Sequence, residues 1–339
     1  MERMFWIKIK YLECTRALEG KILVTGGAGF IGSHVVDALL ARGDDVVVVD
    51  NFNSYYDPKR KIKNISPHLQ KKNFFLAAGN VEDYSFMQNI FQKYSIQRVV
   101  HLAAKAGVRP SIEDPVGYKI ANIDGTLNLL ELAKKHSIDN FVFGSSSSVY
   151  GNSLKIPFSE EDRVDEPISP YAATKRMGEL LCYTYNHLFH LPVSCLRFFT
   201  VYGPRGRPDM APYSFTDAIY HERTITLYGD GSTQRDYTYV GDIVSGILAS
   251  LDKPQAFEIY NLGNRAPISL DEFVSTIETI VGKKALIERK DLFPGDVTLT
   301  CADISKAQRL LHYSPKTSVT EGMQFFFDWY KTESLSSEI

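Results

Sequence analysis

The sequence predicts an α/β fold, namely a Rossmann-type doubly wound parallel sheet with a smaller, irregular C-terminal substrate lobe. An apolar segment at residues 21–25 runs directly into a glycine-rich turn and then into a helical pattern that ends near Gly43. Four consecutive valines at residues 46–49 indicate a strand buried on both faces, as in a parallel sheet. Strand and helix patterns then alternate as far as residue 197, which is the order that builds such a sheet.

The glycine-rich turn has the spacing and the context of a phosphate-binding turn. It follows a strand and precedes a helix, and its glycines are Gly26, Gly29 and Gly32. The first glycine permits a tight turn, the second lets the backbone approach a pyrophosphate, and the third lets the helix pack closely on the strand. The helix N-terminus, which carries Phe30 and Ile31, would then face the phosphates of a dinucleotide.

The next strand, residues 45–50, ends on Asp50, with Asn51 after it. A carboxylate at this place grips the adenosine ribose of a dinucleotide. Because a carboxylate accepts from both ribose hydroxyls and repels a 2′-phosphate, Asp50 favours NAD over NADP. The basic run at residues 59–61 could reach a phosphate, although a solvated loop is the commoner meaning of such a run.

Two further strands are expected to complete the cofactor site. Residues 74–78 form the third strand, and Asn80 and Val81 follow it where an adenine could be held. Residues 98–102 form the fourth strand and lead into small residues that suit close approach to a cofactor. The candidate contacts at this strand end are Leu102, Ala103 and Ala104.

A helix at residues 120–136 leads to a fifth strand at 141–144, which delivers the serine run 145–148. A long helix at 171–189 and a sixth strand at 193–197 follow. Since ligands collect at the carboxyl ends of parallel strands, the serine run and the glycine turn are expected at one edge of the sheet.

Tyr171 and Lys175 are the centre of the predicted chemistry. Four residues apart, they lie on one face of a helix. A phenol is a poor base because its pKa is near 10, but a nearby cation stabilises the phenolate and lowers that value. A hydroxyl from the serine run can share the moving proton. This arrangement can take a proton from a sugar alcohol while a hydride leaves the same carbon, and the dinucleotide site that this chemistry requires lies upstream in the sequence.

The domain boundaries are expected near residues 20 and 200. Residues 1–20 form a leader segment, 21–200 a NAD-binding domain that carries the catalytic residues, and 201–339 mainly a substrate lobe with some segments returning to the sheet. Helical patterns in that last part lie at residues 243–251, 270–281 and 321–330.

Bulk properties exclude several classes of function. The 339 residues are 44% hydrophobic and 23% charged, and the net charge of −2 gives no electrostatic case for nucleic acid or membrane binding. No apolar run approaches the ~20 residues of a spanning helix. The four cysteines lack C-x-x-C spacing and indicate reduced thiols of a cytoplasmic protein, and the eight histidines show no paired metal-ligand spacing.

Together these residues resemble the extended short-chain dehydrogenase/reductase superfamily, in particular the nucleotide-sugar epimerases and dehydratases. The matching stretches are residues 24–32, 101–104 and 145–151, the Tyr171/Lys175 pair, and residues 235–237. Residues 106–109, 197–204 and 206–210 are more closely similar to the UDP-glucuronate 4-epimerases. The resemblance covers roughly residues 21–330.

The resemblance implies NAD-dependent C4 epimerisation of a UDP-sugar, with UDP-glucuronate and UDP-galacturonate as the pair. Hydride abstraction, rotation of a 4-keto sugar and hydride return would make up the reaction. Tyr171 is then the base, Lys175 lowers its pKa and anchors the nicotinamide ribose, and Ser146 is the hydroxyl partner. The implied substrate contacts are Ser146, Ser147, Tyr171, Thr200, Arg207, Tyr228, Arg235 (diphosphate) and Asp296 (uridine ribose).

Arg207 and Thr200 are expected to recognise the C6 carboxylate of a uronate. A guanidinium offers the planar fork that suits a carboxylate, and a hydroxyl can donate to the same group. The alternative is that Arg207 holds its loop against an acid such as Asp209.

Several alternatives remain open at this stage. UDP-glucose and UDP-galactose could be the true pair. A 4,6-dehydratase carries Asp-Glu after the catalytic hydroxyl, and a UDP-glucuronate decarboxylase carries Glu in place of Ser148, whereas this chain has Ser147 and Ser148. A cofactor-binding scaffold without activity is the non-enzymatic alternative.

Departures from the family pattern are Asn80 for an adenine-facing Asp, Phe293 beside the expected diphosphate site, and Lys105, for which the sequence offers no account. Other residues are expected to be structural or solvated. Tyr55 and Tyr56 would be loop packing, His101 a core residue and residues 160–162 a solvated turn, while Arg197 stays open.

The resemblance also implies a homodimer, in which the helices that begin at residues 120 and 171 meet their copies. Leu180, Leu181, Tyr185 and Leu188 would form the exposed apolar patch.

Overall fold

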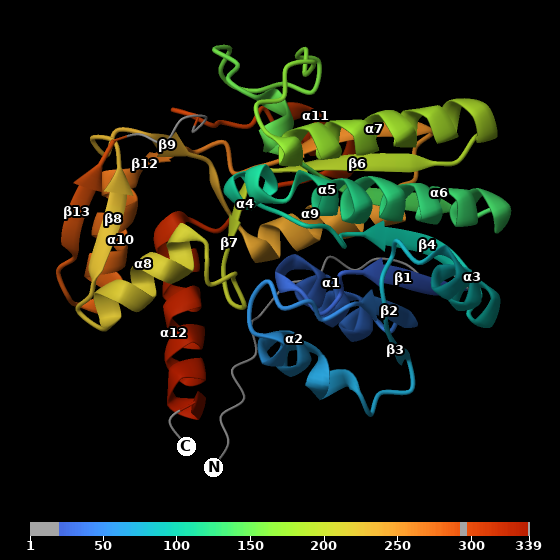
Figure 1. The fold of residues 1–339 in the computed structure, drawn as a ribbon, viewed down its shortest axis with the longest axis horizontal. Helices are drawn as coiled ribbons and strands as arrows, with labels where there is room; N and C mark the ends of the chain where they lie inside the picture. Colours follow the sequence, from blue (N-terminus) through green and yellow to red (C-terminus); the bar gives the residue numbers. More distant parts are fainter. Residues whose placement is uncertain (1–19, 292–296, 338–339) are drawn as a thin grey trace.

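The structure, a computed structural model, describes residues 20–291 and 297–337. The expected leader segment, residues 1–20, lies outside the described residues except for Gly20. A seven-stranded parallel sheet forms the centre of the described chain (Figure 1), in the order β11-β6-β5-β4-β1-β2-β3. Its strands are β1 (Lys21–Thr25), β2 (Val46–Asp50), β3 (Phe74–Ala78), β4 (Ile96–His101), β5 (Asn140–Ser146), β6 (Val193–Phe198) and β11 (Phe257–Leu262).

Helices cover both faces of the sheet and make two separate cores. α1 (Phe30–Arg42) and α9 (Val240–Asp252) pack together over one face. α3 (Tyr84–Lys93), α6 (Gly125–Lys135) and α7 (Pro170–Phe189) cover the other. Strand β2 lies between the two cores, and its valines are fully buried. The predicted Rossmann-type doubly wound sheet is therefore confirmed.

The smaller lobe lies beside the sheet, at the left of Figure 1. Its described residues form three two-stranded pairs. Their strands are β7 (Thr200–Tyr202) with β10 (Tyr237–Tyr239), β8 (Thr224–Tyr228) with β13 (Leu286–Lys290), and β9 (Gln234–Arg235) with β12 (Ile268–Ser269). Its helices are α8 (Ala211–Tyr220), α10 (Leu270–Val281) and α12 (Val319–Ser337). Further helices are α2 (Pro58–Ile65), α4 (Val108–Glu113) and α11 (Ser305–Leu311).

Two expected boundaries were wrong, each for a local reason. The helix expected at 120–136 begins earlier, as α5 (Pro115–Lys119), because Asp114 accepts a hydrogen bond from the backbone N–H of Gly117 and proline occupies the first position. It then continues through a π-helical segment, Ile120–Asp124, into α6. Strand β5 extends beyond residue 144 because its pairing with β6 continues through Ser146.

None of the helices in the described ranges combines the length and the apolar character that a membrane crossing requires.

Candidate active site

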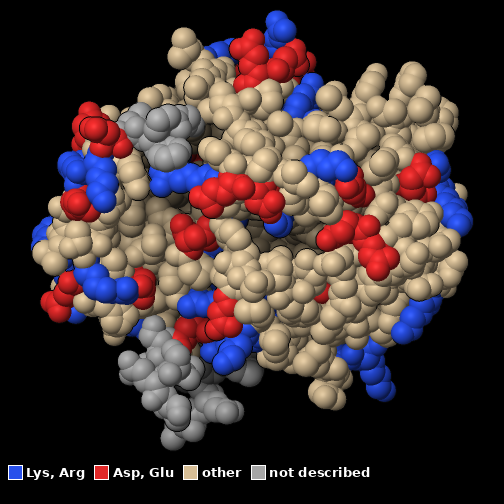
Figure 2. Space-filling view, viewed as in Figure 1, with Lys and Arg blue, Asp and Glu red and all other residues tan. Residues whose placement is uncertain are grey.

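A cavity of about 980 Å³ opens at the carboxyl ends of the central strands, where the smaller lobe meets the sheet. Figure 2 shows the hollow near the middle of this face, with acidic and basic side chains around it. Its walls come from the glycine turn after β1, the ends of β2, β4 and β5, the start of α7, and the loop after β7. This is the edge at which the sequence predicted the glycine turn and the serine run.

The glycine turn has the shape that a pyrophosphate requires. Gly26 has φ +69°, and a Cβ there would lie 2.8 Å from the backbone N of Ala103. A Cβ at Gly32 would lie 2.1 Å from the Gly26 carbonyl, so this glycine lets α1 approach β1. Gly29 precedes α1 without a side-chain cap, and with Phe30 it lines the cavity. An anion can therefore approach the helix N-terminus.

Asp50 ends β2 with its carboxylate buried at the cavity wall. It accepts from the backbone N–H of Ala28 at 3.1 Å and from that of Phe52 at 2.9 Å, so the carboxylate joins the glycine turn to the loop after β2. Asn51 lines the cavity and donates to Asn80 at 2.9 Å. Other predicted cofactor residues that line the cavity are Ile31, Val81, Leu102, Ala103 and Ala104.

Tyr171, Lys175 and Ser146 also come together in this cavity. Pro170 and the Ser169 cap begin α7, which places Tyr171 in its first turn and Lys175 one turn later. The Lys175 ammonium donates to the Gly144 carbonyl at 2.6 Å, and the Ser146 hydroxyl lies close enough to the Tyr171 phenol to act against the rise in its pKa. The Ser146 hydroxyl shares a hydrogen bond with the Ser148 hydroxyl at 3.0 Å, and Ser147 lies at the cavity wall.

The charges around Tyr171 differ from the sequence-based expectation. Burial raises the pKa of Tyr171, while the hydrogen bond from Ser146 and the charge of Arg207 oppose that increase. Burial lowers the pKa of Lys175 to about 8, against the opposing charge of Glu179. Lys175 was expected to lower the pKa of Tyr171. In the structure its ammonium instead donates to the Gly144 carbonyl.

Arg207 and Thr200 lie in the cavity wall contributed by the smaller lobe. Arg207 donates from Nε to one oxygen of Asp209 at 3.0 Å and from Nη2 to the other at 2.5 Å. Tyr55, expected as loop packing, lines the same cavity; its hydroxyl donates to Asp209 at 3.0 Å and lies 3.2 Å from Arg207 Nη2. The Asp209 contact that the alternative interpretation required is therefore present, next to the cavity.

Two predicted substrate residues lie outside this cavity. Tyr228 ends β8, where the Arg109 guanidinium lies 4.5 Å above its ring. Arg235 in β9 donates to the Gln234 carbonyl at 2.9 Å. Asp296, like Phe293, lies outside the described residues.

Tyr118 is a cavity residue that the sequence did not indicate. Its ring meets the Tyr171 ring edge to face, with centroids 6.2 Å apart. Lys105 also lines the cavity and forms an ion pair with Asp114 at 2.5 Å. Since Asp114 caps α5, this pair connects the loop after β4 to that helix, which accounts for Lys105 as a departure from the family pattern. Both contacts depend on the non-regular start of the helix at 115, which no periodic pattern predicts.

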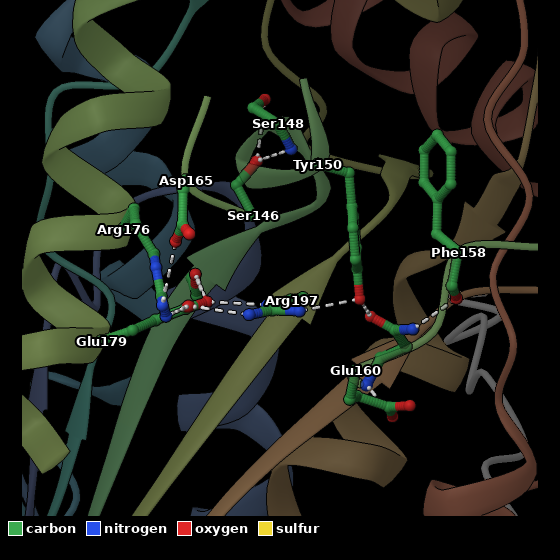
Figure 3. Close-up of polar contacts among 11 residues, drawn as sticks. Ser146, Ser148, Tyr150, Phe158, Glu160, Asp165, Arg176, Glu179 and Arg197 are labelled. Atoms are coloured by element: carbon green, nitrogen blue, oxygen red, sulfur yellow. Dashed lines mark hydrogen bonds and ion pairs between the residues drawn. The ribbon is translucent and has the colours of Figure 1, made fainter. Parts of the chain in front are cut away.

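A buried polar network lies behind the serine strand (Figure 3). Arg197 on β6 pairs with both oxygens of Glu179 on α7 at 2.9 Å and donates to the Tyr150 hydroxyl at 2.9 Å. Tyr150 then donates to Asn261 on β11 at 2.7 Å. The structural interpretation of Arg197 is thus supported. Glu160 was wrongly expected to be solvated, because it accepts from the Asn261 backbone N–H at 2.8 Å.

His101 is a satisfied core residue, as expected. Its ring nitrogens contact the Thr25 hydroxyl at 2.7 Å and the Thr126 hydroxyl at 2.9 Å, and burial lowers its pKa to about 3. Within residues 20–291 and 297–337, no group of three or more His, Cys, Asp or Glu side chains is arranged to hold a metal ion.

Comparisons with known proteins agree with this arrangement. The profile of the family described as GDP-mannose 4,6 dehydratase matches residues 23–325. A UDP-glucuronate 4-epimerase of Thermodesulfobacterium geofontis is 46% identical over 313 residues, or 92% of this chain and 96% of its own length. UDP-glucuronate 4-epimerase 4 of Arabidopsis thaliana is 43% identical over 91% of this chain and 75% of its own length.

Among solved structures, a UDP-glucuronic acid 4-epimerase of Bacillus cereus in complex with UDP-glucuronic acid and NAD superposes with a TM-score of 0.88. It is 38% identical, and the match covers 92% of this chain and 99% of that one. A UDP-glucose 4-epimerase of Thermotoga maritima with UDP-glucose gives 0.86 at 32% identity, over 93% and 99% of the two chains. The chain therefore belongs to the extended short-chain dehydrogenase/reductase family that contains the UDP-glucuronate 4-epimerases.

Proposed function

We propose that this protein catalyses the NAD-dependent C4 epimerisation of a UDP-sugar, converting UDP-glucuronate to UDP-galacturonate. The observation that carries the proposal is the meeting of Tyr171, Lys175 and Ser146 in one cavity with the glycine turn on one side and Arg207 on the other. A base, a dinucleotide cradle and a carboxylate-binding cation are the parts that this reaction needs. The relatives named UDP-glucuronate 4-epimerase, at 42–46% identity, support the same substrate pair.

The residues of the cradle fit NAD. The turn at Gly26 and Gly29 leaves space for a pyrophosphate at the N-terminus of α1, and Asp50 presents a carboxylate for an adenosine ribose. Asn51, Val81 and the 102–104 segment would hold the adenine side and the nicotinamide side, while Lys175 would hold the nicotinamide ribose. When bound, NAD supplies the reversible hydride acceptor for C4 of the sugar.

The chain itself manages the proton. Tyr171 takes the proton of the C4 hydroxyl and returns it after the 4-keto sugar has turned in the cavity. Ser146 stabilises the phenolate by donating to it, and the Arg207 charge acts in the same direction. Because burial otherwise raises the pKa of Tyr171, these two groups are what the chain itself supplies to make the phenol usable as a base.

Arg207 and Thr200 would bind the C6 carboxylate. The sugar ring must turn within the pocket, so the pocket cannot hydrogen-bond every hydroxyl of the sugar. A carboxylate provides one strong interaction that can persist while the ring turns. Asp209 and Tyr55 keep the guanidinium hydrogen-bonded at other times. Arg235 and Asp296 would hold the diphosphate and the uridine ribose, and Tyr228 would be a further substrate contact of the lobe.

The second candidate is a UDP-glucose/UDP-galactose 4-epimerase, and the Arg207–Asp209 pair favours it because the guanidinium already has a carboxylate partner. A 4,6-dehydratase lacks its acid and base here, since Ser147 and Ser148 stand in the two positions. Incubation of the purified protein with UDP-glucuronate and with UDP-glucose, followed by separation of the products, distinguishes these candidates. Conversion of UDP-glucose alone would contradict the proposal.

We propose a homodimer built on α5, α6 and α7. The structure revises the predicted patch: Tyr185 is buried and Leu181 is partly buried, whereas Leu180 and Leu188 are exposed, together with Met177. Such a face would be covered by a second copy. Light scattering should give about twice the chain mass of 38.2 kDa, and a mass near one chain would contradict the dimer.

We also propose that residues 21–200 form the NAD-binding part and 201–339 mainly the substrate lobe.

Cys182, Cys195 and Cys301 are free and buried, which suits a reducing compartment such as the cytoplasm.

A further inference from the structure

Two consecutive residues at the end of β5 bond to residues of α7, and the next residue, Ser146, lies beside a third. The Gly144 carbonyl accepts from Lys175 at 2.6 Å, and the Ser145 hydroxyl donates to Glu179 at 2.6 Å. The Ser146 hydroxyl also lies beside the Tyr171 phenol and opposes the rise in its pKa. Tyr171, Lys175 and Glu179 follow one another at intervals of four, so they lie on one face of the helix. The helix and the strand that carry the reacting groups are therefore joined by two hydrogen bonds, and Glu179 makes one of them.

The Glu179 carboxylate is fixed by several charged hydrogen bonds. Both its oxygens are paired with Arg197 at 2.9 Å, and Arg176 donates to one of them at 3.1 Å. Glu179 is 1% exposed and so is Arg197. Figure 3 shows this carboxylate between the two arginines, with Arg197 continuing to Tyr150. A charge this deeply buried is stable only where its partners satisfy it, so its place is fixed by α7, β5 and β6 together.

Glu179 also dominates the charge environment of Lys175. The charged or titratable groups around that ammonium are Glu179 and Cys182 on α7 and His101 on β4, and the Phe143 ring of β5 lies 5.2 Å away. His101 is neutral, because burial lowers its pKa to about 3. Burial lowers the pKa of Lys175 to about 8, and Glu179 is the largest influence that opposes this. Without its charge, the ammonium would lose its proton at a lower pH.

We propose that Glu179 is a positioning residue for the epimerisation: its carboxylate sets α7 against β5 so that Ser146 lies beside Tyr171, and it places a negative charge one helical turn from Lys175. The proposal rests on the proposed function, because it assigns Glu179 a part in that reaction. Glu179 does not touch the cavity, and it acts only through Ser145 and Lys175.

The test uses three variants of the full chain, with UDP-glucuronate as the substrate. Glu179→Gln/Arg197→Met removes both charges of the pair together, so that no unpaired charge is left in the core. Ser145→Ala removes only the bond between β5 and Glu179. Arg176→Met, at the more exposed end of the network, is the matched control. The readouts are kcat and KM against pH, the melting temperature, and the titration of Lys175 followed by NMR of 15N-labelled lysine.

The double variant should melt near the wild-type temperature. Because Glu179, and not Arg197, is among the charges that act on the pKa of Lys175, the alkaline limb of the kcat profile and the Lys175 titration should both move to lower pH by about one unit. Ser145→Ala should lower kcat by about 3- to 10-fold with little change in KM, because small misplacements of reacting groups are costly. Arg176→Met should not move the limb to lower pH, since it removes a cation.

Two results would overturn the proposal. One is a double variant with wild-type kcat and an unmoved Lys175 titration; the other is a Ser145→Ala variant with wild-type kcat. If the double variant does not fold, Ser145→Ala decides alone. Failure of the proposed function looks different, because the wild type would then not convert UDP-glucuronate. An unmoved Lys175 titration would still count against Glu179 in that case, since it requires no turnover.

Discussion

Replacing Arg207 by methionine tests whether this enzyme recognises a uronate. Methionine keeps much of the side-chain volume and removes the guanidinium that lines the cavity. If Arg207 binds the C6 carboxylate, kcat/KM for UDP-glucuronate should fall, while kcat/KM for UDP-glucose should change little or improve. The second substrate has no carboxylate, so it serves as an internal control for damage to the loop.

The structure sets the size of the expected loss. A hydrogen bond between charged groups contributes about 1.5–3 kcal/mol. Because Asp209 already receives two of the guanidinium N–H groups, a substrate carboxylate gains less than it would from an unpaired arginine. We therefore expect the lower part of the range, about 1.5–2 kcal/mol, which corresponds to about a 13- to 30-fold fall in kcat/KM.

The assay measures initial rates on both UDP-sugars, with the products separated by chromatography. Arg163→Met is a matched control, because Arg163 is a highly exposed arginine that pairs with Asp165 by its side chain. It should leave both substrates unaffected. Equal losses on both substrates in Arg207→Met would refute uronate recognition, and would mean that Arg207 only holds its loop against Asp209.

Three further predictions concern the same groups. Tyr171→Phe should lower kcat by about 10²- to 10⁴-fold and leave NAD bound, as measured by cofactor release on denaturation; activity within about twofold of wild type would be incompatible with its role as base. Asp209→Asn should lower KM for UDP-glucuronate by about 2- to 5-fold, the effect of a partly exposed ion pair, and leave UDP-glucose unaffected; an unchanged KM would show that Asp209 does not compete for Arg207. Burial lowers the pKa of His101 from 6.5 to about 3, so between these pH values the ring binds a proton in the unfolded chain and not in the folded one. The contribution of His101 to the free energy of unfolding is therefore fully present above pH 6.5. It falls toward pH 3 by up to about 1.4 kcal/mol per pH unit. The melting temperature of wild type should therefore fall more steeply between pH 6.5 and 4.5 than that of His101→Asn, and parallel curves would exclude this origin.

Local patterns in the sequence were sufficient to predict the elements that carry the site. The glycine turn lies between a strand and a helix, and the Tyr171/Lys175 pair needs only one helix to come together, so short-range geometry fixes both. Strand β2 was recognisable because four buried valines leave no polar face. Each of these features depends on residues that are close in the chain.

Contacts between distant residues could not be predicted in the same way. Tyr55 meets Arg207 across 152 positions, and the sequence contains no period that links them. Tyr118 reaches Tyr171 from α5, the helical segment that begins at Pro115, five residues before the expected start of the helix. The raised pKa of Tyr171 follows from burial, which is a property of the assembled cavity and not of the Y-x-x-x-K spacing.

The position of β11 also determines when the sheet can be completed during synthesis. β11 pairs with β6 along its whole length, and α9 covers the adjoining face, although both come from the C-terminal half. A nascent chain that has just delivered β6 therefore exposes an unpaired strand edge and an uncovered apolar face. The 64 residues from Phe198 to Leu262 require roughly 3–13 s of synthesis at about 5–20 residues per second. During those seconds the ribosome-bound chain has the kind of open edge that chaperones protect and that other nascent chains can pair with.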